Sequence, residues 1–293
     1  MLRRVRRLLE LIRFSHTVFA LPFALLAAVL AWRDEPVRWH DALGIVLCMV
    51  FARSAAMAFN RLADRHIDAQ NPRTAARHLP AGTLGVPTVA VFTVVCCAAF
   101  VASTLLFWVR EPSNPWPLYL SGPVLLFVLG YSLAKRFTSL AHFWLGAALM
   151  LAPVAAWIAV KGLADMTVPL LLGAAVLFWV SGFDILYACQ DAAFDKAQGL
   201  HSVPARLGVK RSLRVAAVCH AVMFGMLVGL FFASPHLGSV FLGGLVLVGA
   251  LLVYEHALVR ADDLTRVNRA FFHVNGVISV GLLVLVLVQL WVK

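Results

Sequence analysis

Residues 215–254 have the sequence VAAVCHAVMFGMLVGLFFASPHLGSVFLGGLVLVGALLVY, a run of 40 residues without Asp, Glu, Lys or Arg. A helix needs about 20 mostly apolar residues to cross a bilayer, so this run predicts two spanning helices. The natural break between them is Ser234-Pro235-His236, because proline ends a helix. This stretch predicts an integral membrane protein.

The composition of the whole chain supports the same fold class. The 293 residues are 62% hydrophobic and 13% charged, whereas soluble domains are about half apolar and a quarter charged. A disordered protein, a coiled coil and a water-soluble enzyme are therefore excluded. A net charge of +11 points to nucleic acid or to an anionic membrane. The apolar content favours the membrane, and no nucleic-acid partner is expected.

Further apolar segments predict the remaining helices. Leu79–Val109 is too long for one span, so its first part, which contains Pro80, Gly82, Gly85 and Pro87, is read as a loop. With the two helices of residues 215–254 the count is nine, in one all-α transmembrane domain over residues 1–293. The other predicted spans are Phe14–Trp32, Ala42–Asn60, the later part of Leu79–Val109, Pro112–Ala134, Phe137–Val160, Met166–Phe183 and Ala270–Val292.

The basic residues predict how this domain is oriented. Cytoplasmic loops carry the excess of Lys and Arg. With nine helices, 19 of the 25 Lys and Arg residues fall on one side and five on the other, while Arg53 lies within a helix. The N-terminus is thus expected in the cytoplasm and the C-terminus on the opposite side. Residues 1–13 are read as a basic cytoplasmic segment at the membrane surface.

The first polar motif, Asn60-Arg61-Leu62-Ala63-Asp64-Arg65-His66-Ile67-Asp68, begins the loop after the second predicted helix. Asn60, Asp64 and Asp68 follow one another at intervals of four residues. On a helix these positions share one face.

A second motif follows the sixth predicted helix, where Tyr187, Asp191 and Asp195 have the same spacing. Asp184 precedes Asp191 by about two helical turns. Both motifs are expected at the cytoplasmic face, so two pairs of carboxylates would project from two helix ends on one side of the membrane.

Carboxylates near a membrane are costly and usually functional. Asp64, Asp68, Asp191 and Asp195 supply hard oxygen ligands, which suit Mg²⁺ held together with substrate phosphates. The alternative is that they are solvated charges paired with Arg or Lys, and two matched motifs on one side argue against it. Basic residues after both motifs, and at the end of the fourth predicted helix on the same side, predict an anion site for a diphosphate: Arg73, Arg77, Lys135, Arg136, Lys196 and Arg206.

These motifs resemble those of the UbiA family of membrane prenyltransferases. Residues 60–68 resemble the family pattern N-D-x-x-D-x-x-x-D, and residues 187–195 with Gly199 resemble Y-A-x-Q-D-x-x-x-D…G. Residues 131–138 resemble Y-P-x-x-K-R-x-T, and Arg13 with residues 19–26 is similar to the family's first-helix entry. The resemblance covers nearly the whole chain. It implies nine transmembrane helices around a central cavity.

The resemblance also implies a reaction and its residues. A polyprenyl diphosphate binds through Mg²⁺, its allylic C–O bond ionises, and the carbocation alkylates an acceptor, commonly an aromatic ring. Asp64, Asp68, Asp191 and Asp195 would be the catalytic and metal-binding residues. Arg13, Asp184 and Tyr187 would lie on the acceptor side. The diphosphate would be held by Asn60, Arg73, Arg77, Lys135 and Arg136.

One position departs from the pattern, because Arg61 stands where Asp is most common. This removes one carboxylate, and we expect fewer metal ligands in the first motif rather than loss of activity. The surrounding residues resemble a bacterial quinone-biosynthesis subgroup that acts on 4-hydroxybenzoate. Prenylation of 1,4-dihydroxy-6-naphthoate in menaquinone synthesis stays open. The subgroup places the enzyme in the bacterial inner membrane, with its active site toward the cytoplasm.

Other classes of membrane protein fit the sequence less well. A transporter usually places its carboxylates at mid-membrane, near broken helices, and an inert membrane protein has no need of four aligned Asp residues. A CDP-alcohol phosphotransferase would carry a D-x-x-D-G signature, which is absent from the sequence. Haem O synthase belongs to the same family, but residues 187–199 resemble the quinone branch more closely.

Overall fold

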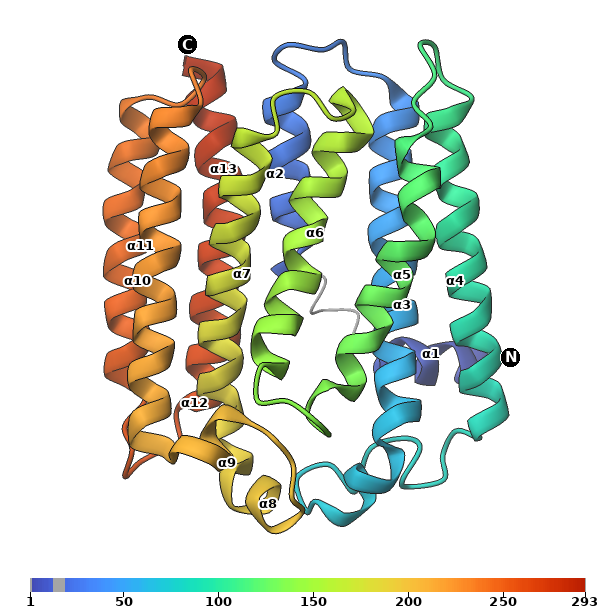
Figure 1. Ribbon diagram of the computed structural model, residues 1–293, viewed down its shortest axis with the longest axis vertical. Coiled ribbons are helices and arrows are strands. Elements are labelled where there is room, and N and C mark those ends of the chain that lie inside the picture. The colour runs from blue at the N-terminus through green and yellow to red at the C-terminus, as the bar shows by residue number, and fades with distance from the viewer. Residues whose placement is uncertain (1, 13–18, 293) are drawn as a thin grey trace. The chain divides into compact units, whose positions relative to one another are not determined.

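The computed structural model describes residues 2–12 and 19–292, and the described residues form helices, turns and loops without a strand. The all-α prediction is therefore confirmed. Figure 1 shows the main helices, which are joined at their ends by turns, loops and short helices. These helices are α2 (Leu21–Ala31), α3 (Trp39–Gln70), α4 (Val86–Trp108), α5 (Trp116–Ala134), α6 (Ala141–Lys161), α7 (Thr167–Ala188), α10 (Val209–Ala233), α11 (Ser239–Leu258) and α13 (Asn275–Val292).

Shorter helices flank the long ones. α1 lies at the N-terminus, and a 3₁₀ turn, η2, joins α7 to α8. A π-helical turn, η3, leads into α13. Their bounds are α1 (Leu2–Leu11), η2 (Cys189–Asp191), α8 (Ala192–Ala197), α9 (Val203–Leu207), α12 (Val267–Arg269) and η3 (Ala270–Val274).

Eight helices in the described part of the chain are long and apolar enough to span a membrane. The first predicted span, Phe14–Trp32, corresponds to α2, which is apolar but has 11 residues, about 16 Å of helix. Residues 14–18 of that span lie outside the described residues. The nine predicted segments thus match nine apolar helices, while a count of nine full spans stays a prediction. The break at Ser234-Pro235-His236 is confirmed, because α10 ends at Ala233 and α11 begins at Ser239.

Two predicted helix ends were too early. The sixth span was expected to end at Phe183, but α7 continues to Ala188, because no Gly or Pro follows Phe183 within it. The second span was expected to end at Asn60, with a loop after it. Instead α3 continues without interruption to Gln70 and has 32 residues, about 48 Å. No Gly or Pro occurs between Asn60 and Gln70, so nothing in that segment breaks the helix. The first motif therefore lies on a helix.

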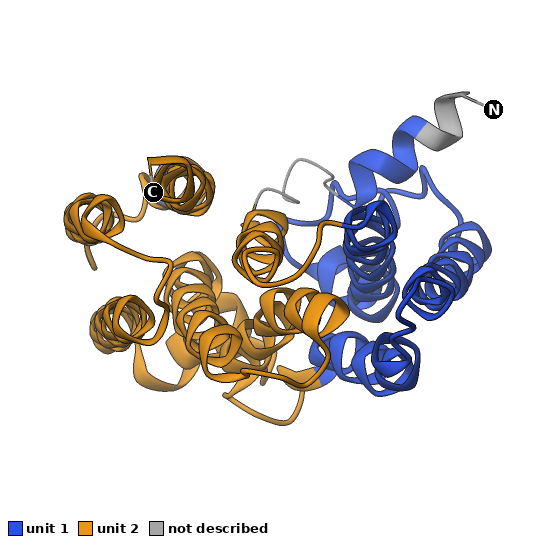
Figure 2. Cartoon of the chain, turned by 90° about the horizontal axis from the view of Figure 1, so that it is seen from above, with its two compact units in different colours: residues 1–17, 38–133 blue, residues 18–37, 134–293 orange. Residues whose placement is uncertain are grey.

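The chain divides into two compact units, which Figure 2 shows in different colours. Unit 1 contains residues 1–17 and 38–133, and thus α1, α3, α4 and nearly all of α5. Its helices α3 and α4 pack closely, and Gly44 on α3 meets the Phe107 ring of α4 at a distance that leaves no room for a Cβ atom. At the other end, α1 packs onto this pair through a buried apolar cluster of Leu11, Ile12, Ala58, Leu84 and Val89.

Unit 2 contains residues 18–37 and 134–293, and α7 is its central helix, since it packs against α6 and α10. Glycines permit the close contacts on both sides of α7. A Cβ atom at Gly146 of α6 would collide with the Leu177 carbonyl of α7, and one at Gly182 would collide with the His220 ring of α10. Small residues allow membrane helices to approach in this way.

Buried polar side chains link four helices of unit 2. The Trp179 indole of α7 donates to Asn275 Oδ1 of α13 at 2.6 Å, and Asn275 Nδ2 donates to Glu255 Oε1 of α11 at 2.7 Å. The His220 ring of α10 approaches the other Glu255 oxygen at 3.6 Å. Such bonds hold membrane helices together where water is absent.

The single domain over residues 1–293 and the central cavity, both expected from the sequence, remain predictions.

Candidate functional site

The first motif occupies the last turns of α3, in unit 1. The side chains of Asp64 and Asp68 are buried, with 3% and 4% of their surface exposed. Asn60 Nδ2 donates to Asp64 Oδ2 at 3.3 Å, as their spacing of one helical turn allows. Arg61 turns its guanidinium toward the Asn60 side-chain oxygen, at 3.5 Å. Asn60, Asp64 and Asp68 thus form a polar stripe at one helix end.

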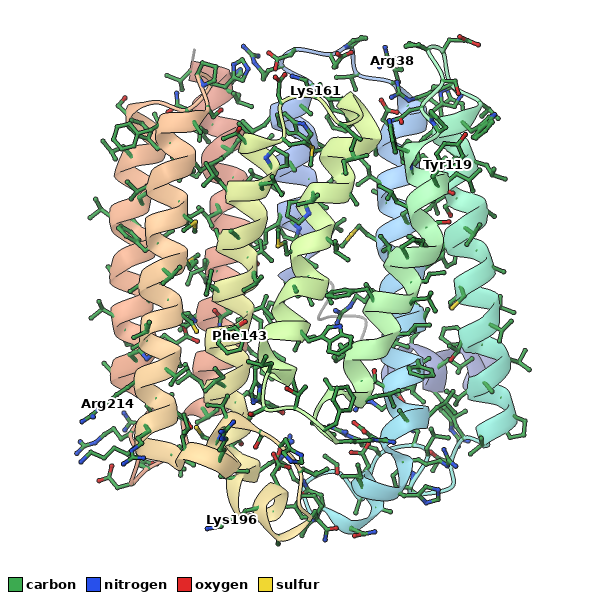
Figure 3. The ribbon with its side chains drawn as sticks, in the orientation of Figure 1. Arg38, Tyr119, Phe143, Lys161, Lys196 and Arg214 are labelled. Atoms are coloured by element: carbon green, nitrogen blue, oxygen red, sulfur yellow. The ribbon has the colours of Figure 1, made fainter. Side chains whose placement is uncertain are left out.

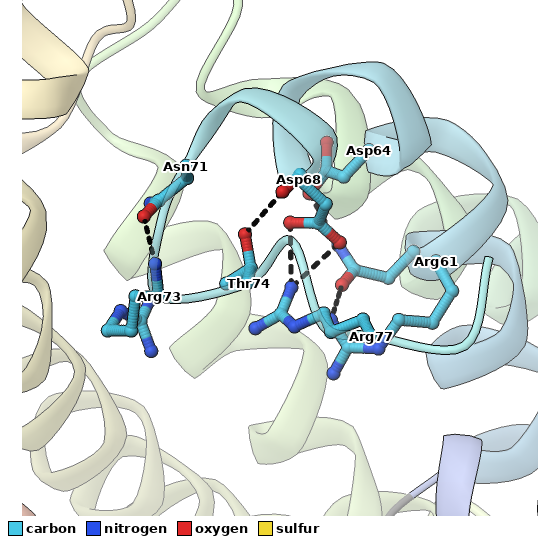
Figure 4. Close-up of polar contacts among 8 residues, drawn as sticks. Arg61, Asp64, Asp68, Asn71, Arg73, Thr74 and Arg77 are labelled. Carbon is cyan, nitrogen blue, oxygen red and sulfur yellow. Dashed lines mark hydrogen bonds and ion pairs between the residues drawn. The ribbon is translucent and has the colours of Figure 1, made fainter. Parts of the chain in front are cut away.

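Asp68 is held by the loop that follows α3 (Figure 4). Arg77 Nη1 donates to both carboxylate oxygens of Asp68, at 2.8 Å each. The Thr74 hydroxyl donates to the Asp68 carbonyl at 3.0 Å, and Asn71 Oδ1 accepts from the Arg73 backbone at 2.9 Å. The buried carboxylate therefore has a cationic partner, which offsets the cost of its burial.

The rest of this loop is tied to the N-terminal helix. Arg7 of α1 donates to the Thr83 carbonyl at 3.0 Å, and His78 lies 3.7 Å from Glu10. Arg73 is exposed, whereas Arg77 is half-buried against Asp68. Of these two predicted diphosphate ligands, Arg77 contacts a predicted metal ligand and Arg73 is the more exposed.

The second motif lies where α7 gives way to a 3₁₀ turn, in unit 2. Tyr187 is in α7, Asp191 ends the 3₁₀ turn and Asp195 lies in α8. The regular helical spacing expected for these residues is thus interrupted at Cys189–Asp191.

The structure explains the glycine of this motif. The Gly199 amide donates to the Lys196 carbonyl, the Leu200 amide donates to the Asp195 carbonyl, and Gly199 has a φ of 66°. This pattern is a Schellman cap, whose left-handed residue is usually glycine.

Asp195 lies among charged and polar groups of its own unit. Ser202, Asp191, Lys135 and His142 lie near enough to its carboxylate to interact with it electrostatically, and the Leu200 amide donates to its backbone carbonyl at 2.8 Å. Ser202 also caps α9, because its hydroxyl accepts from the Ala205 amide at 3.2 Å. The structure therefore brings together Asp191, Asp195 and Lys135, which the sequence predicted as site residues. Arg136, next to Lys135, is exposed.

Asp184 is paired with a histidine that the sequence did not single out. His142 Nδ1 of α6 lies 2.7 Å from Asp184 Oδ2 of α7, and His142 Nε2 accepts from the Val203 amide at 3.3 Å. Tyr187 is half-buried one helical turn further along. Arg13, the third residue predicted on the acceptor side, lies outside the described residues.

Two other residues were missed by motif reading. Arg53 is a cation within the apolar part of α3, and its Nε atom is buried without a hydrogen-bond partner among the described residues. A charge inside an apolar run is itself a signal of function. Ser202 carried the weaker signal of an N-cap residue before Pro204.

Basic residues lie at both ends of the helices of unit 2. Figure 3 shows Lys196 and Arg214 at one end of this unit and Lys161 at the other. Lys161 donates to Asp34 and Asp165 at 2.9 Å each. The second motif shares the end that carries Lys196.

Comparison with known proteins decides the family. The model of the UbiA prenyltransferase family matches residues 20–277. The chain belongs to the UbiA prenyltransferase family. Its identification as a prenyltransferase, an enzyme, is thereby confirmed. As a UbiA protein with several apolar spans, it is a multi-pass membrane protein.

Named UbiA relatives cover most of the chain. A 4-hydroxybenzoate octaprenyltransferase of Aromatoleum aromaticum is 31% identical over 84% of this chain and 79% of its own length. One of Vibrio parahaemolyticus is 30% identical over 88% of each chain.

Solved structures share the UbiA fold. The apo structure of a UbiA homolog from Aeropyrum pernix K1 has a TM-score of 0.82 and 31% identity, and covers 95% of this chain and 98% of that one. A UbiA homolog from Archaeoglobus fulgidus bound to GPP and Mg²⁺ has a TM-score of 0.73 at 18% identity, over 97% and 99% of the two chains. The fold class predicted from the sequence is confirmed by these matches.

Proposed function

We propose that this protein transfers a polyprenyl group from a polyprenyl diphosphate to an aromatic acid, with 4-hydroxybenzoate as the acceptor, in respiratory quinone synthesis. The observation that carries the proposal is the pair of buried carboxylates, Asp64 and Asp68, at the end of a long apolar helix beside Arg77. A second carboxylate pair, Asp191 and Asp195, lies beside Lys135 in a protein of the UbiA family.

The donor set of both motifs fits Mg²⁺. Within the described residues no group of three or more His, Cys, Asp or Glu side chains could hold a metal ion. Each motif instead offers a pair of carboxylates, and Mg²⁺ is usually bound through one or two carboxylates plus substrate phosphates. Asp64 and Asp68 would hold the ion at one motif, and Asp191 and Asp195 at the other. Bound Mg²⁺ would neutralise the diphosphate and make it a better leaving group.

The names of relatives support the choice of substrates. The Archaeoglobus fulgidus homolog is described as bound to GPP and Mg²⁺, and also to DMAPP and Mg²⁺, both of which are prenyl diphosphates. The relatives from Aromatoleum and Vibrio are named for 4-hydroxybenzoate and an octaprenyl group. We transfer the substrate class to this chain, with a polyprenyl diphosphate as donor.

The basic residues of the chain act on the leaving group. Arg73, Lys135 and Arg136 would donate to diphosphate oxygens, with Asn60 as a neutral donor and Arg77 joining them once it leaves Asp68. The allylic C–O bond breaks, both electrons leave with the diphosphate, and the allylic cation forms a bond to a ring carbon of the acceptor. That carbon then loses its proton. Apolar surroundings protect the cation from water.

The acceptor brings a carboxylate, which needs a counter-charge in an apolar environment. Arg53 provides a cation within α3 whose Nε atom is buried and without a hydrogen-bond partner among the described residues. We assign Arg53 to the acceptor carboxylate. Asp184 and Tyr187 are assigned to the acceptor or the cation, which the Tyr187 ring could stabilise through its π face. Arg13 keeps its predicted place on the acceptor side.

The orientation follows from the charge asymmetry. With most Lys and Arg residues on one side, the N-terminus and both motifs would face the bacterial cytoplasm and the C-terminus would lie opposite, in the inner membrane. Water-soluble acceptors made in the cytoplasm would then reach the motifs directly, while the prenyl chain would enter from the bilayer.

The proposal is tested by incubating the purified protein with a polyprenyl diphosphate, Mg²⁺ and a panel of aromatic acids. The products are identified by mass spectrometry. The panel contains 4-hydroxybenzoate and 1,4-dihydroxy-6-naphthoate. Prenylated 4-hydroxybenzoate is the expected product. Prenylation of the naphthoate alone would indicate a role in menaquinone synthesis instead. The absence of a prenylated product with every acid of the panel would refute the proposal.

A further inference from the structure

A buried histidine joins three segments of unit 2. His142 lies in the first turn of α6, and 5% of its surface is exposed. Its Nε2 atom lies 3.3 Å from the Val203 amide nitrogen, which can only donate. Nε2 is therefore the unprotonated nitrogen, and the ring proton resides on Nδ1. This proton points to Asp184 Oδ2, 2.7 Å away. The two contacts fix the tautomer and the orientation of the ring.

The segment that His142 contacts is anchored at three consecutive residues, 201–203. The His201 amide donates to the Lys135 carbonyl at 2.7 Å, and the Val203 amide donates to His142. Just before them, the Leu200 amide donates to the Asp195 carbonyl at 2.8 Å, and the Ser202 side chain lies near enough to the Asp195 carboxylate to interact with it. Because Ser202 also accepts from the Ala205 amide, its position is fixed relative to the start of α9. The orientation of Asp195 thus depends on where residues 201–203 are held.

We propose that His142 is a positioning residue, which holds residues 201–203 through the Val203 amide so that Ser202 orients Asp195 for the metal–diphosphate complex. This inference rests on the function proposed above and extends it to a residue that contacts neither substrate. Asp184 takes part by fixing the ring of His142. Groups that orient metal ligands from behind typically change metal affinity about 10–100-fold when they are removed.

Two substitutions at His142 separate its two contacts. His142→Asn keeps an amide N–H near the Nδ1 position and removes the acceptor for Val203. His142→Gln places an amide oxygen near the Nε2 position, where it can accept from Val203. Ser202→Ala removes the partner of Asp195 directly. Ser181→Ala is the matched control. The Ser181 hydroxyl donates to the backbone carbonyls of Leu177 and His142, where α6 packs against α7. These bonds do not involve residues 201–203.

The first measurement is Mn²⁺ binding to each full-length variant in detergent, followed by the electron paramagnetic resonance of free Mn²⁺. The second is amide hydrogen exchange over residues 200–207. We expect His142→Asn to weaken Mn²⁺ binding about ten-fold and to speed exchange at Val203. We expect His142→Gln and Ser181→Ala to bind Mn²⁺ as the wild type does. Ser202→Ala should weaken Mn²⁺ binding as His142→Asn does. The double variant His142→Asn/Ser202→Ala should bind Mn²⁺ little more weakly than either single variant.

The proposal is overturned if His142→Asn binds Mn²⁺ with wild-type affinity, or if His142→Gln and His142→Asn weaken binding equally. It is also overturned if the wild-type protein binds no Mn²⁺. Should His142→Asn fail to fold, the comparison of Ser202→Ala with wild type decides in the same way. A wild-type protein that binds Mn²⁺ but prenylates no aromatic acid refutes the proposed function alone, because the binding comparison does not depend on turnover.

Discussion

Arg77 Nη1 lies 2.8 Å from both carboxylate oxygens of Asp68, nine residues earlier in the chain. One of these residues is assigned to the metal and the other to the diphosphate, yet in the structure each is the other's partner. The pair keeps a carboxylate that is 4% exposed from being buried without a counter-charge. We expect Arg77 to compete with a metal ion for the Asp68 carboxylate, and the incoming diphosphate would supply a new partner for Arg77.

This exchange predicts opposite effects of Arg77→Ala on two ligands. Removing the competing cation should tighten the binding of Mn²⁺ alone by about ten-fold, since a hydrogen bond to a charged group contributes about 1.5–3 kcal/mol. The same change should raise the KM for the prenyl diphosphate, because a cation that holds it is lost. Both effects are measured on the purified protein, by Mn²⁺ titration and by initial rates.

Arg65→Ala is the control for this prediction, because Arg65 bonds to the Leu62 carbonyl on its own helix. It should leave both quantities near their wild-type values. Weaker Mn²⁺ binding in Arg77→Ala would show that Arg77 supports the metal site rather than competing with the metal.

Much of the fold could be predicted because each span has its own apolar run. The breaks at Pro235 and in the loop before α4 were likewise visible as proline and glycine. The end of α3 was not visible, because Asn60–Gln70 is polar and a polar segment after an apolar run usually indicates a loop, although this one contains no helix breaker. The Asp residues were found through their spacing. His142 was missed because its partners, Asp184 and Val203, are 42 and 61 residues away.

The cap at Gly199 predicts a local loss of stability. Gly199 has a φ of 66°, and its Cβ position is open, so the cost of Gly199→Ala comes from the backbone alone. A left-handed residue other than glycine costs about 1–2 kcal/mol. We expect a small fall in Tm and faster amide exchange over α8. Gly276→Ala, at an open position in the first turn of α13, should show no such change in α8.

The polar link around Asn275 predicts a larger effect. Asn275→Ala removes bonds to Trp179 and Glu255 and leaves two buried polar groups without them. Bonds of this kind contribute about 0.6–1.7 kcal/mol each in membrane proteins. We expect unfolding in a denaturing detergent to become easier by about 2 kcal/mol, with Mn²⁺ binding unchanged in the folded fraction. Wild-type resistance to the detergent would contradict a stabilising role of this link.

The ion pair of Asp34 with Lys161 predicts that the stability of the fold depends on pH. Asp34 lies outside the membrane-spanning helices. The hydrogen bond from Lys161 holds the pKa of Asp34 below its usual value, and His236 assists. The ionised carboxylate therefore stabilises the fold above its unfolded pKa of about 3.9, and this contribution is lost as the pH falls through the lower folded pKa. Because Asp34 is 44% exposed, its contribution is about 0.5 kcal/mol.

Asp34→Asn should thus lower the Tm slightly at pH 7, and the difference from wild type should vanish in acid. Asp262→Asn serves as the control, since the Asp262 side chain is 75% exposed. A difference between Asp34→Asn and wild type that grows as the pH falls would contradict the assignment.

Metal-dependent prenyl transfer is the central claim, and one rate tests it most directly. The purified wild-type protein is given a polyprenyl diphosphate and 4-hydroxybenzoate, first with excess EDTA and then with added Mg²⁺, and prenylated 4-hydroxybenzoate is quantified by mass spectrometry. The account predicts no product in EDTA and a rate restored by Mg²⁺, with Asp191→Asn slower by orders of magnitude under the same conditions. Undiminished product formation in EDTA would contradict it.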